Sequence, residues 1–511
     1  MRKISIGKKI KRRSTKMIAE ELINTARNEF ERVLQYVVKT DNTQISDMEK
    51  GIFRHLLKIG FILLLVYVQK FAVKVTNCHI DKNGVKREFH SVRNRDYLSV
   101  FGKIEIIRPY YWRKGSEGIC PADAELNLPE GVYSYLLQEW GTCLSTEQPY
   151  EKAAAFLNTF LNMQIWNSSL EEIARKSSKS VNEFYNTRLV SLDNKNDILV
   201  ATVDCKGIQM RKSELQAKEV QPKFKRMRRP GERAVKGEES SKNIEKRDGK
   251  KKMSVITAVY TINRHMRTVD DIMSKHKGKS DKKSPLPPRP QEKIVYGTLN
   301  GKQAAFEYLK LEISKRDREN KKRIALVDGE LKLNEMLKEY LPGFEIIRDF
   351  FHVTEYLWDG SHIFYEKGSK KADELVSRYV QMLLNGNVSN IILEMRSQFK
   401  KTKKSKAKIK ELGRITKYLE NGKDYMKYDE YLASGYPIGS GVIEGTCKNL
   451  VNDRFEHTGM HWSIEGANAL LGLRSIHVNN LTSSYWQFHQ KKERERLYGH
   501  LSDGIDMRLV A

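Results

Sequence analysis

The 511-residue sequence has little cysteine and proline, with five cysteines and 12 prolines. The cysteines are scattered and form no CxxC pair, which excludes a disulfide framework and a cysteine-rich zinc site and favours a reducing compartment. The scarcity of proline excludes collagen-like and proline-rich chains. The longest apolar run, Ile59–Val68, has about half the length of a membrane span, and no apolar core follows the basic N-terminus closely enough for a signal peptide. We therefore expect a soluble, cytoplasmic protein with no membrane partner.

Positive charge is what the sequence has in excess. Its 92 Lys and Arg residues outnumber 64 Asp and Glu residues, for a formal net charge of +28. This excess is larger than solubility requires, so it favours a polyanionic partner, most commonly nucleic acid. A hydrophobic content of 39% supplies material for real cores, and the length suggests about two to four domains.

The N-terminal part, residues 1–195, has the pattern of a mostly helical domain with a small β element at about 72–112. A helical repeat of three and four predicts one buried face in the first helix, made of Ile18, Leu22, Ile23, Ala26, Phe30, Val33, Leu34 and Val37. A second helix, Phe53–Phe71, is apolar on most sides, so we expect it to be largely buried. Lys82-Asn83-Gly84 is a hairpin turn signal.

After residue 196 the pattern changes to short runs of β-branched residues. We predict four strands: Ile198–Val203, Met253–Tyr260, Arg323–Val327 and Phe344–Arg348. A helix-length segment separates the last two, which indicates a βαβ unit and hence a parallel sheet with covered faces. Residues 205–252 and 275–293 have the composition of basic loops, and residues 361–435 have a helical pattern.

Three of these predicted strands end in a carboxylate, at Asp204, Asp328 and Asp349, and the first two are the candidates for a shared metal ion. If the strands are neighbours, about 4.8 Å apart, one Mg²⁺ could lie between the two side chains. A third acid would complete a site for two metal ions, suited to in-line displacement at phosphorus. The best candidate is Glu444, which follows a glycine-rich turn into a helix and has Lys448 one turn further on.

The same residues allow plainer interpretations. A strand-terminal Asp can be a helix cap or turn former, and the Gly-Ser-Gly turn before Glu444 can be a phosphate-binding turn or only a cap. His352 can be a buried hydrogen-bonding histidine. The other acids that compete to be the third ligand are Glu330, Asp349, Glu456 and Glu465.

Seven ordered motifs resemble those of the ISKra-type insertion-sequence transposases. They are Val203-Asp-Cys-Lys-Gly207, Met227-Arg-Arg-Pro-Gly-Glu232, Leu326-Val-Asp-Gly-Glu330, Asp349-Phe-Phe-His-Val-Thr-Glu-Tyr-Leu-Trp358, Tyr428-Asp-Glu-Tyr-Leu-Ala433, Gly435-Tyr-Pro-Ile-Gly-Ser-Gly-Val-Ile-Glu-Gly445 and Thr458-Gly-Met-His-Trp462. The resemblance covers about residues 195–480, and extends more loosely to Arg108-Pro-Tyr-Tyr-Trp112 and Cys120-Pro-Ala-Asp123.

The resemblance implies a DDE-type enzyme with a ribonuclease-H-like α/β core, related to the Mutator-like group. In that case Asp204, Asp328 and Glu444 are the catalytic and metal-binding triad for two Mg²⁺ ions, which Mn²⁺ can replace. Asp349, His352 and Trp358 would have a supporting role. The implied domains are an N-terminal domain at 1–195 that binds DNA ends, core strands at 196–360, a helical insertion at 361–435, a core helix region at 436–480 and a C-terminal tail at 481–511.

The expected function is a DNA transposase that cleaves the ends of its element and joins the 3′-hydroxyls to target DNA. The expected partners are double-stranded DNA, which would associate the protein with a bacterial nucleoid, and further copies of the chain in a homodimer or larger assembly. Candidate DNA contacts are Lys223, Lys225, Arg226, Arg228, Arg229, Lys448 and Arg454. The alternatives are a metal-dependent nuclease or resolvase without strand transfer, a non-catalytic transposase-derived DNA-binding protein, and an RNA-processing protein.

Overall fold

The computed structural model describes residues 15–41, 43–72, 75–190, 197–216, 251–276, 287–317, 321–400, 405–456 and 459–501. The chain divides into two compact units. The N-terminal unit contains residues 1–184 together with 481–511, and the second unit contains residues 185–480. The basic cluster Lys223, Lys225, Arg226, Arg228 and Arg229 lies outside the described residues.

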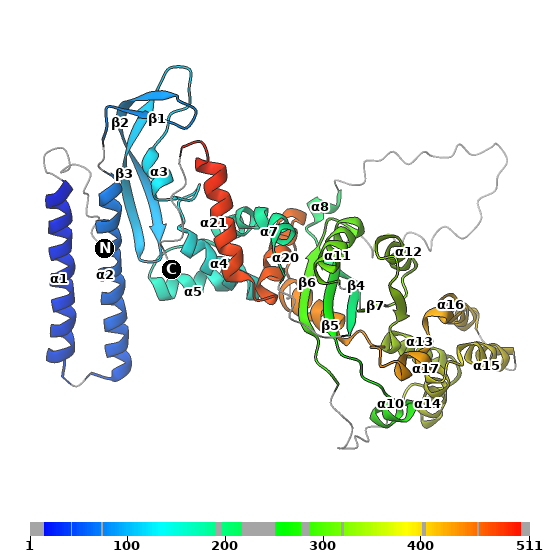
Figure 1. Cartoon of the computed structure of the whole chain (residues 1–511). Coiled ribbons are helices and arrows are strands. Elements are labelled where there is room, and N and C mark those ends of the chain that lie inside the picture. Colours follow the sequence, from blue (N-terminus) through cyan, green and yellow to red (C-terminus); the bar gives the residue numbers. More distant parts are fainter. Residues whose placement is uncertain are drawn as a thin grey trace, which may run out of the picture. The chain divides into compact units, whose positions relative to one another are not determined.

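The N-terminal unit begins with two long helices and a small antiparallel sheet (Figure 1). Helices α1 (Thr15–Lys39) and α2 (Ile45–Ala72) are followed by strands β1 (Cys78–Ile80), β2 (Lys86–Ser99) and β3 (Gly102–Trp112), in the order β1-β2-β3. Gly84, with φ +74°, makes the predicted turn between β1 and β2. Helices α3 (Pro121–Glu125), α4 (Tyr135–Glu147), α5 (Tyr150–Leu161), α6 (Asn167–Ser177) and α7 (Val181–Thr187) follow.

The burial predicted for α1 and α2 is largely wrong. In α1, Ala26 and Val33 are buried, but Ile23, Phe30, Leu34 and Val37 of the same expected face are exposed. Helix α2 contains a segment, Ile45–Gln69, that is long and apolar enough to cross a membrane, and only 17% of its most apolar stretch is buried. The two helices are joined by the buried Glu29 of α1, whose carboxylate contacts His55 Nδ1 at 2.9 Å and Lys58 Nζ at 2.6 Å.

The two looser N-terminal motifs meet at one buried carboxylate. Asp123, at the start of α3, forms ion pairs with Arg108 of β3 and with Arg95 of β2, the latter at 3.1 Å. Burial raises the pKa of Asp123 above its usual range, although both guanidinium groups oppose the rise. These motif residues therefore hold α3 against the small sheet.

The C-terminal segment also belongs to the N-terminal unit. Residues predicted as a tail form helix α21 (Thr482–Tyr498). Its Tyr485 hydroxyl donates to the carbonyl of Ser177, His489 Nδ1 lies 3.1 Å from Ser180 Oγ, and Tyr498 donates to Leu128 at 2.7 Å. Residues from both ends of the described chain thus belong to one compact unit.

The second unit is built on a five-stranded mixed sheet of order β6-β5-β4-β7-β8. The strands are β4 (Ile198–Gln209), β5 (Lys251–Ile262), β6 (Gln291–Thr298), β7 (Lys322–Val327) and β8 (Glu345–Arg348). Strands β4, β7 and β8 are parallel, and helix α12 (Leu331–Tyr340) connects β7 to β8, as the predicted βαβ unit requires. The fold class is therefore mixed α/β.

Three details of the sheet differ from the sequence-based expectation. Strands β5 and β6 run antiparallel to their neighbours, so the sheet is not purely parallel. Strand β6 was missed because its first residues lie in a Lys- and Pro-rich segment that we expected to be a loop. Strand β4 does not end at Asp204 but continues to Gln209 beside β5.

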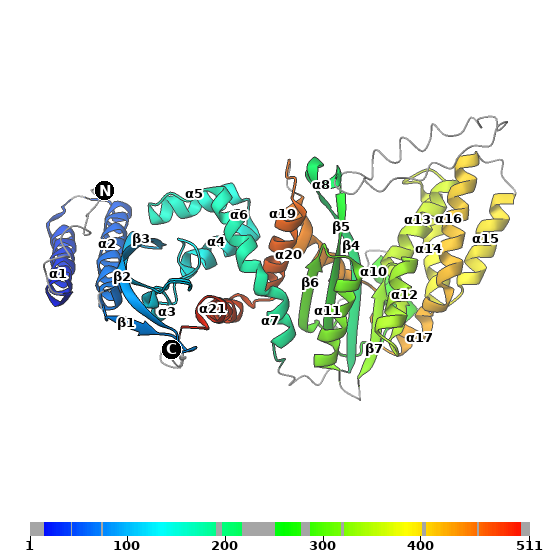
Figure 2. The ribbon, with the colours of Figure 1, turned by 90° about the horizontal axis from the view of Figure 1, so that it is seen from above.

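Helices cover both faces of this sheet (Figure 2). Helix α11 (Lys302–Arg316) packs on one face through the stacked rings of Tyr296 and Tyr308, at 4.0 Å. On the other face, α20 (Ile464–Val478) packs through Leu471 beside Gly297. That second face also carries a core formed with the helices predicted at 361–435. They are α14 (Lys370–Leu384), α15 (Val388–Lys400), α16 (Lys406–Gly422) and α17 (Tyr428–Ala433), and they pack with α13 (Phe350–Phe364), most of which precedes the predicted range.

Candidate active site

Asp204 and Asp328 occupy equivalent positions in adjacent parallel strands. The last residues paired between β4 and β7 are Thr202 and Leu326, and each Asp follows two residues later. Neighbouring strands are about 4.8 Å apart, so the two aspartates emerge side by side at one edge of the sheet. Both are partly exposed to solvent.

Helix α18 (Gly441–Cys447) runs across this edge and is anchored near both ends. Next to its first residue, Ser440 donates from its backbone N to Asp349 Oδ1 at 3.1 Å and from its hydroxyl to Oδ2. At its end, Cys447 Sγ donates to Asp204 Oδ2 at 3.2 Å. Asp349 follows β8 and Asp204 lies on β4, so α18 spans from the end of β8, past β7, to β4.

The length of α18 matches this span. Ser440 and Cys447 are seven residues apart, which is about 10.5 Å along a helix, and two strand spacings are about 9.6 Å. Glu444 lies between the two anchors, and its Oε1 lies 3.2 Å from Ser440 Oγ. The structure therefore brings Glu444 to the edge from which Asp204 and Asp328 emerge.

These carboxylates do not form an assembled metal shell. Within the described ranges, no three His, Cys, Asp or Glu side chains are grouped closely enough to hold a metal ion. Asp204 Oδ1 accepts from Cys205 N at 2.6 Å, and Asp328 Oδ1 accepts from Glu330 N at 2.9 Å. As oxygen donors the three acids fit Mg²⁺, but their side chains are engaged in local hydrogen bonds.

The thiols near the site are donors rather than thiolates. Burial and the neighbouring Asp204 raise the pKa of Cys447 far above its usual range, and burial raises the pKa of Cys205 to about 12. Both thiols remain protonated at neutral pH, so the Cys447 S–H is available to donate to Asp204 Oδ2.

Asp349 holds the start of α18 rather than facing Asp204. It is 2% exposed, caps α13 by accepting from Phe351 N at 3.0 Å, and lies two strands from Asp204, as the strand order requires. Burial raises its pKa, although its hydrogen bonds to Ser440 and Phe351 act against the rise. A metal ion shared by Asp349 and Asp204 is excluded by that separation.

The loop after β7 is supported by a stack of side chains that the sequence did not reveal. The Tyr418 hydroxyl donates to the carbonyl oxygen of Asp328 at 2.7 Å. The Tyr418 ring stacks on Tyr356 at 3.7 Å with an interplanar angle of 2°, and the buried Arg348 guanidinium lies 4.4 Å from its other side. Gly329, with φ +99°, leaves room for that guanidinium, because an added Cβ would lie 2.7 Å from it. No spacing rule links Tyr418 to Asp328 across the helical insertion.

The remaining predicted site residues have different surroundings. His352 is partly exposed on α13, where its ring packs edge-on against Tyr356 and Tyr418. Trp358 packs against the apolar core of the insertion. Lys448 is exposed where α18 continues into a π-helical turn, Lys448–Asn452, a local geometry that is frequent at functional sites.

The prediction that Arg454 contacts DNA is wrong. Its side chain is 0% exposed, and its guanidinium lies 4.9 Å from the ring centre of Trp462. A buried guanidinium has no surface to offer to a phosphate, so Arg454 is part of the core that places the Gly459–Trp462 segment.

Comparison with models of known protein families and with curated proteins finds no match to this chain.

Proposed function

We propose that this chain is a DDE-type DNA transposase that cleaves the ends of its own element and joins the freed 3′-hydroxyls to target DNA. The observation that carries the proposal is that Asp204 and Asp328 occupy equivalent positions on adjacent parallel strands. Glu444 lies on helix α18, which is hydrogen-bonded to Asp349 and Asp204 at the same edge of the sheet. Three carboxylates at this end of the sheet, if their side chains turn towards a shared metal ion, suit metal-assisted displacement at phosphorus.

Each group has a distinct role in this proposal. Asp204, Asp328 and Glu444 would hold Mg²⁺, which supplies an activated attacking oxygen and stabilises the leaving oxygen. Asp349 and Ser440 would fix the start of α18, and so the distance between Glu444 and the strands. Lys448 is exposed one turn after Glu444 and would contact the DNA backbone, which gives salt-sensitive binding.

The test uses a supercoiled plasmid that carries the DNA flanking the gene on both sides. Purified protein is incubated with it in Mg²⁺ or Mn²⁺, and all breaks and new junctions are mapped by sequencing. We expect breaks at fixed positions, joined to new sites. Glu444→Gln and Asp204→Asn should each reduce cleavage by at least ~10³-fold, equivalent to about 4 kcal/mol of transition-state stabilisation, and leave DNA affinity nearly unchanged.

The matched control is Glu430→Gln, which changes an exposed acid on α17 in the same way and should cleave normally. Breaks without new junctions would replace the transposase with a nuclease. DNA binding with no cleavage in either metal would leave a DNA-binding protein. Full cleavage by Glu444→Gln would assign the third acid elsewhere, first to Glu456.

A further inference from the structure

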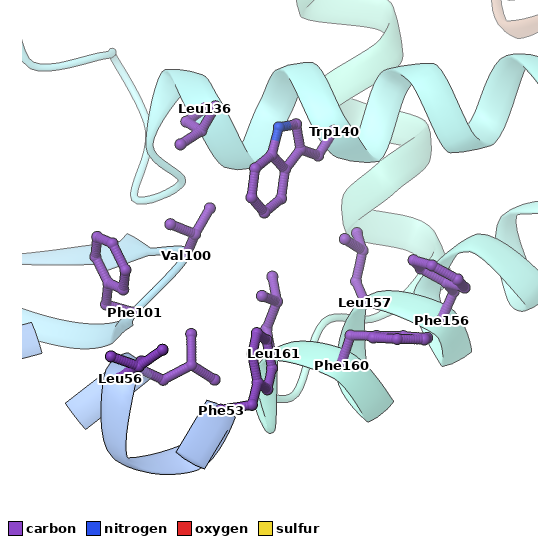
Figure 3. A pocket seen from close by; sticks show the side chains of 11 residues that line it. Phe53, Leu56, Val100, Phe101, Leu136, Trp140, Phe156, Leu157, Phe160 and Leu161 are labelled. Atoms are coloured by element: carbon purple, nitrogen blue, oxygen red, sulfur yellow. The ribbon is translucent and has the colours of Figure 1, made fainter. Parts of the chain in front are cut away.

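The N-terminal unit contains an apolar cavity that the proposed chemistry does not use (Figure 3). Its volume is about 450 Å³. Its walls come from α2, from the turn between β2 and β3, and from α4 and α5, and every lining side chain is apolar: Phe53, Leu56, Leu57, Val100, Phe101, Leu136, Trp140, Phe156, Leu157, Phe160 and Leu161. Among the described residues the lining holds no cation, so the cavity is unsuited to a phosphate or nucleic acid.

The large side chains around this cavity are unusually exposed. Leu56 and Phe160 are each 53% exposed, Phe156 is 45% exposed and Trp140 is 42% exposed. The apolar stripe of α2 continues at helical spacing to Leu63 and Tyr67, which are 52% and 51% exposed. Leu56, Leu63 and Tyr67 lie in the part of α2 that the sequence predicts to be buried.

The exposed area is sufficient for a stable protein interface. The exposed fractions of the large side chains around the cavity, together with those of Leu63 and Tyr67, add up to about four fully exposed side chains. At roughly 200 Å² for each, this is about 800 Å², which is the contribution of each partner to an interface of standard size. Scattered surface leucines do not form such a patch, so this one marks an interaction site.

We propose that this cavity is the docking surface for a second copy of the chain, in a two-fold symmetric dimer. A two-fold interface must be self-complementary, and this patch has both a hollow and a ridge. The ridge is the pair of stacked rings of Phe156 and Phe160, 4.3 Å apart, and it borders the hollow (Figure 3). The ridge of each copy enters the hollow of the other, so both patches are buried by one contact.

The charge of the protein sets the conditions for this association. Two copies that each carry +28 repel one another, but at physiological salt the repulsion is screened beyond roughly 8 Å. An apolar contact free of charged groups is little affected by salt. The dimer should therefore become tighter as salt increases, which is opposite to the trend for DNA binding.

The first experiment measures the mass of the full-length protein in solution by light scattering and sedimentation, without DNA, across a range of concentrations at physiological salt. We expect a dimer whose dissociation constant increases at least ~100-fold in the double variant Phe156→Asp, Phe160→Asp, equivalent to about 2.7 kcal/mol. The matched control is Leu393→Asp on α15, which changes a side chain that is 62% exposed outside the patch and should remain dimeric. Circular dichroism and thermal melting check that each variant is folded.

A second experiment does not depend on destabilising substitutions. Photoreactive benzoylphenylalanine replaces Phe160, and protein labelled with ¹⁵N is mixed with unlabelled protein before irradiation. We expect mixed-isotope cross-links to peptides that contain Phe53, Leu56 or Trp140. A monomer at every concentration, a dimer unaffected by the double variant, or cross-links confined to single chains would overturn the proposal. So would a monomer that binds phospholipid vesicles through this patch. No DNA reaction enters these readouts, so their failure leaves the proposed function untouched.

Discussion

The two units of the chain use similar apolar patterns in different ways. In the second unit, the runs predicted as strands are buried by helices on both faces of the sheet, and Val200, Leu326 and Ile347 are each 0% exposed. In the N-terminal unit, helices with equally strong apolar patterns leave Phe30, Leu56 and Leu63 about half exposed. The difference teaches that an apolar pattern predicts burial but not the partner that provides it. Within the sheet the partner is the same chain, and for α2 we infer that it is another copy.

The largest expected effect compares one substitution in both units. Leu326→Ala removes a fully buried side chain from strand β7 and should lower the free energy of unfolding by about 2–5 kcal/mol, because it leaves a cavity. Leu63→Ala removes a side chain of α2 that is 52% exposed, and should cost no more than about 0.5 kcal/mol in dilute protein. Urea denaturation at low and high protein concentration measures both losses of unfolding free energy. The loss caused by Leu63→Ala should increase with concentration, because we infer that Leu63 is buried when the dimer forms. Equal losses of unfolding free energy for the two variants in dilute protein would contradict the difference in burial between the two units.

The next effect concerns pH and should be confined to the N-terminal unit. Burial lowers the pKa of His489 from 6.5 to about 4, with Arg496 adding to the effect and Glu493 opposing it. Between these values the unfolded chain binds a proton that the folded chain does not, so stability falls as the pH is lowered from 6.5 towards 4. The loss should approach about 3 kcal/mol at the lower end. Hydrogen exchange followed by mass spectrometry should show earlier opening of α21 than of the five-stranded sheet.

His489→Gln tests that assignment, because its side chain can still hydrogen-bond near Ser180 but does not titrate. We expect its acid sensitivity to be reduced, whereas His500→Gln, at an exposed position, should behave like the natural chain. An unchanged pH dependence in His489→Gln would assign the acid sensitivity to other groups.

The smallest expected effect tests how the insertion supports the candidate site. Tyr418→Phe keeps the ring between Arg348 and Tyr356 but loses the hydrogen bond to the Asp328 carbonyl. We expect a stability loss of about 0.5–1.5 kcal/mol, and a reduction of metal-dependent cleavage by roughly 10–100-fold, typical of residues that orient ligands. The control is Tyr379→Phe, because the buried Tyr379 hydroxyl has no hydrogen-bond partner among the described residues and its loss should be neutral. Equal effects of the two variants on stability and cleavage would show that Tyr418 does not position the candidate site.

The sequence predicts the parts of this fold that depend on local pattern. The β-branched runs locate β4, β5, β7 and β8, and the helix between the last two predicts their parallel pairing. It does not predict β6, whose first residues are charged and follow a proline-rich segment, nor the antiparallel direction of β5, which depends on tertiary pairing. Among the site residues, Asp204, Asp328 and Glu444 carry a pattern that can be recognised. Tyr418 and Cys447 do not, because their contacts join residues that are 90 and 243 positions apart. The burial of Arg454 likewise follows from packing against Trp462 rather than from any local pattern.

The placement of α21 has a consequence for how the protein is made. The N-terminal unit receives this helix from residues 482–498, although the rest of its helices and strands are complete by residue 187. During synthesis, which proceeds from the N-terminus at about 5–20 residues per second, roughly 300 residues of the other unit leave the ribosome before α21 does. The second unit can thus finish folding first, before α21 is available to pack against the earlier helices of the N-terminal unit. A nascent chain stalled before residue 482 would expose the places where Tyr485, His489 and Tyr498 later pack, so completion of the N-terminal unit reports that the second unit has already been translated.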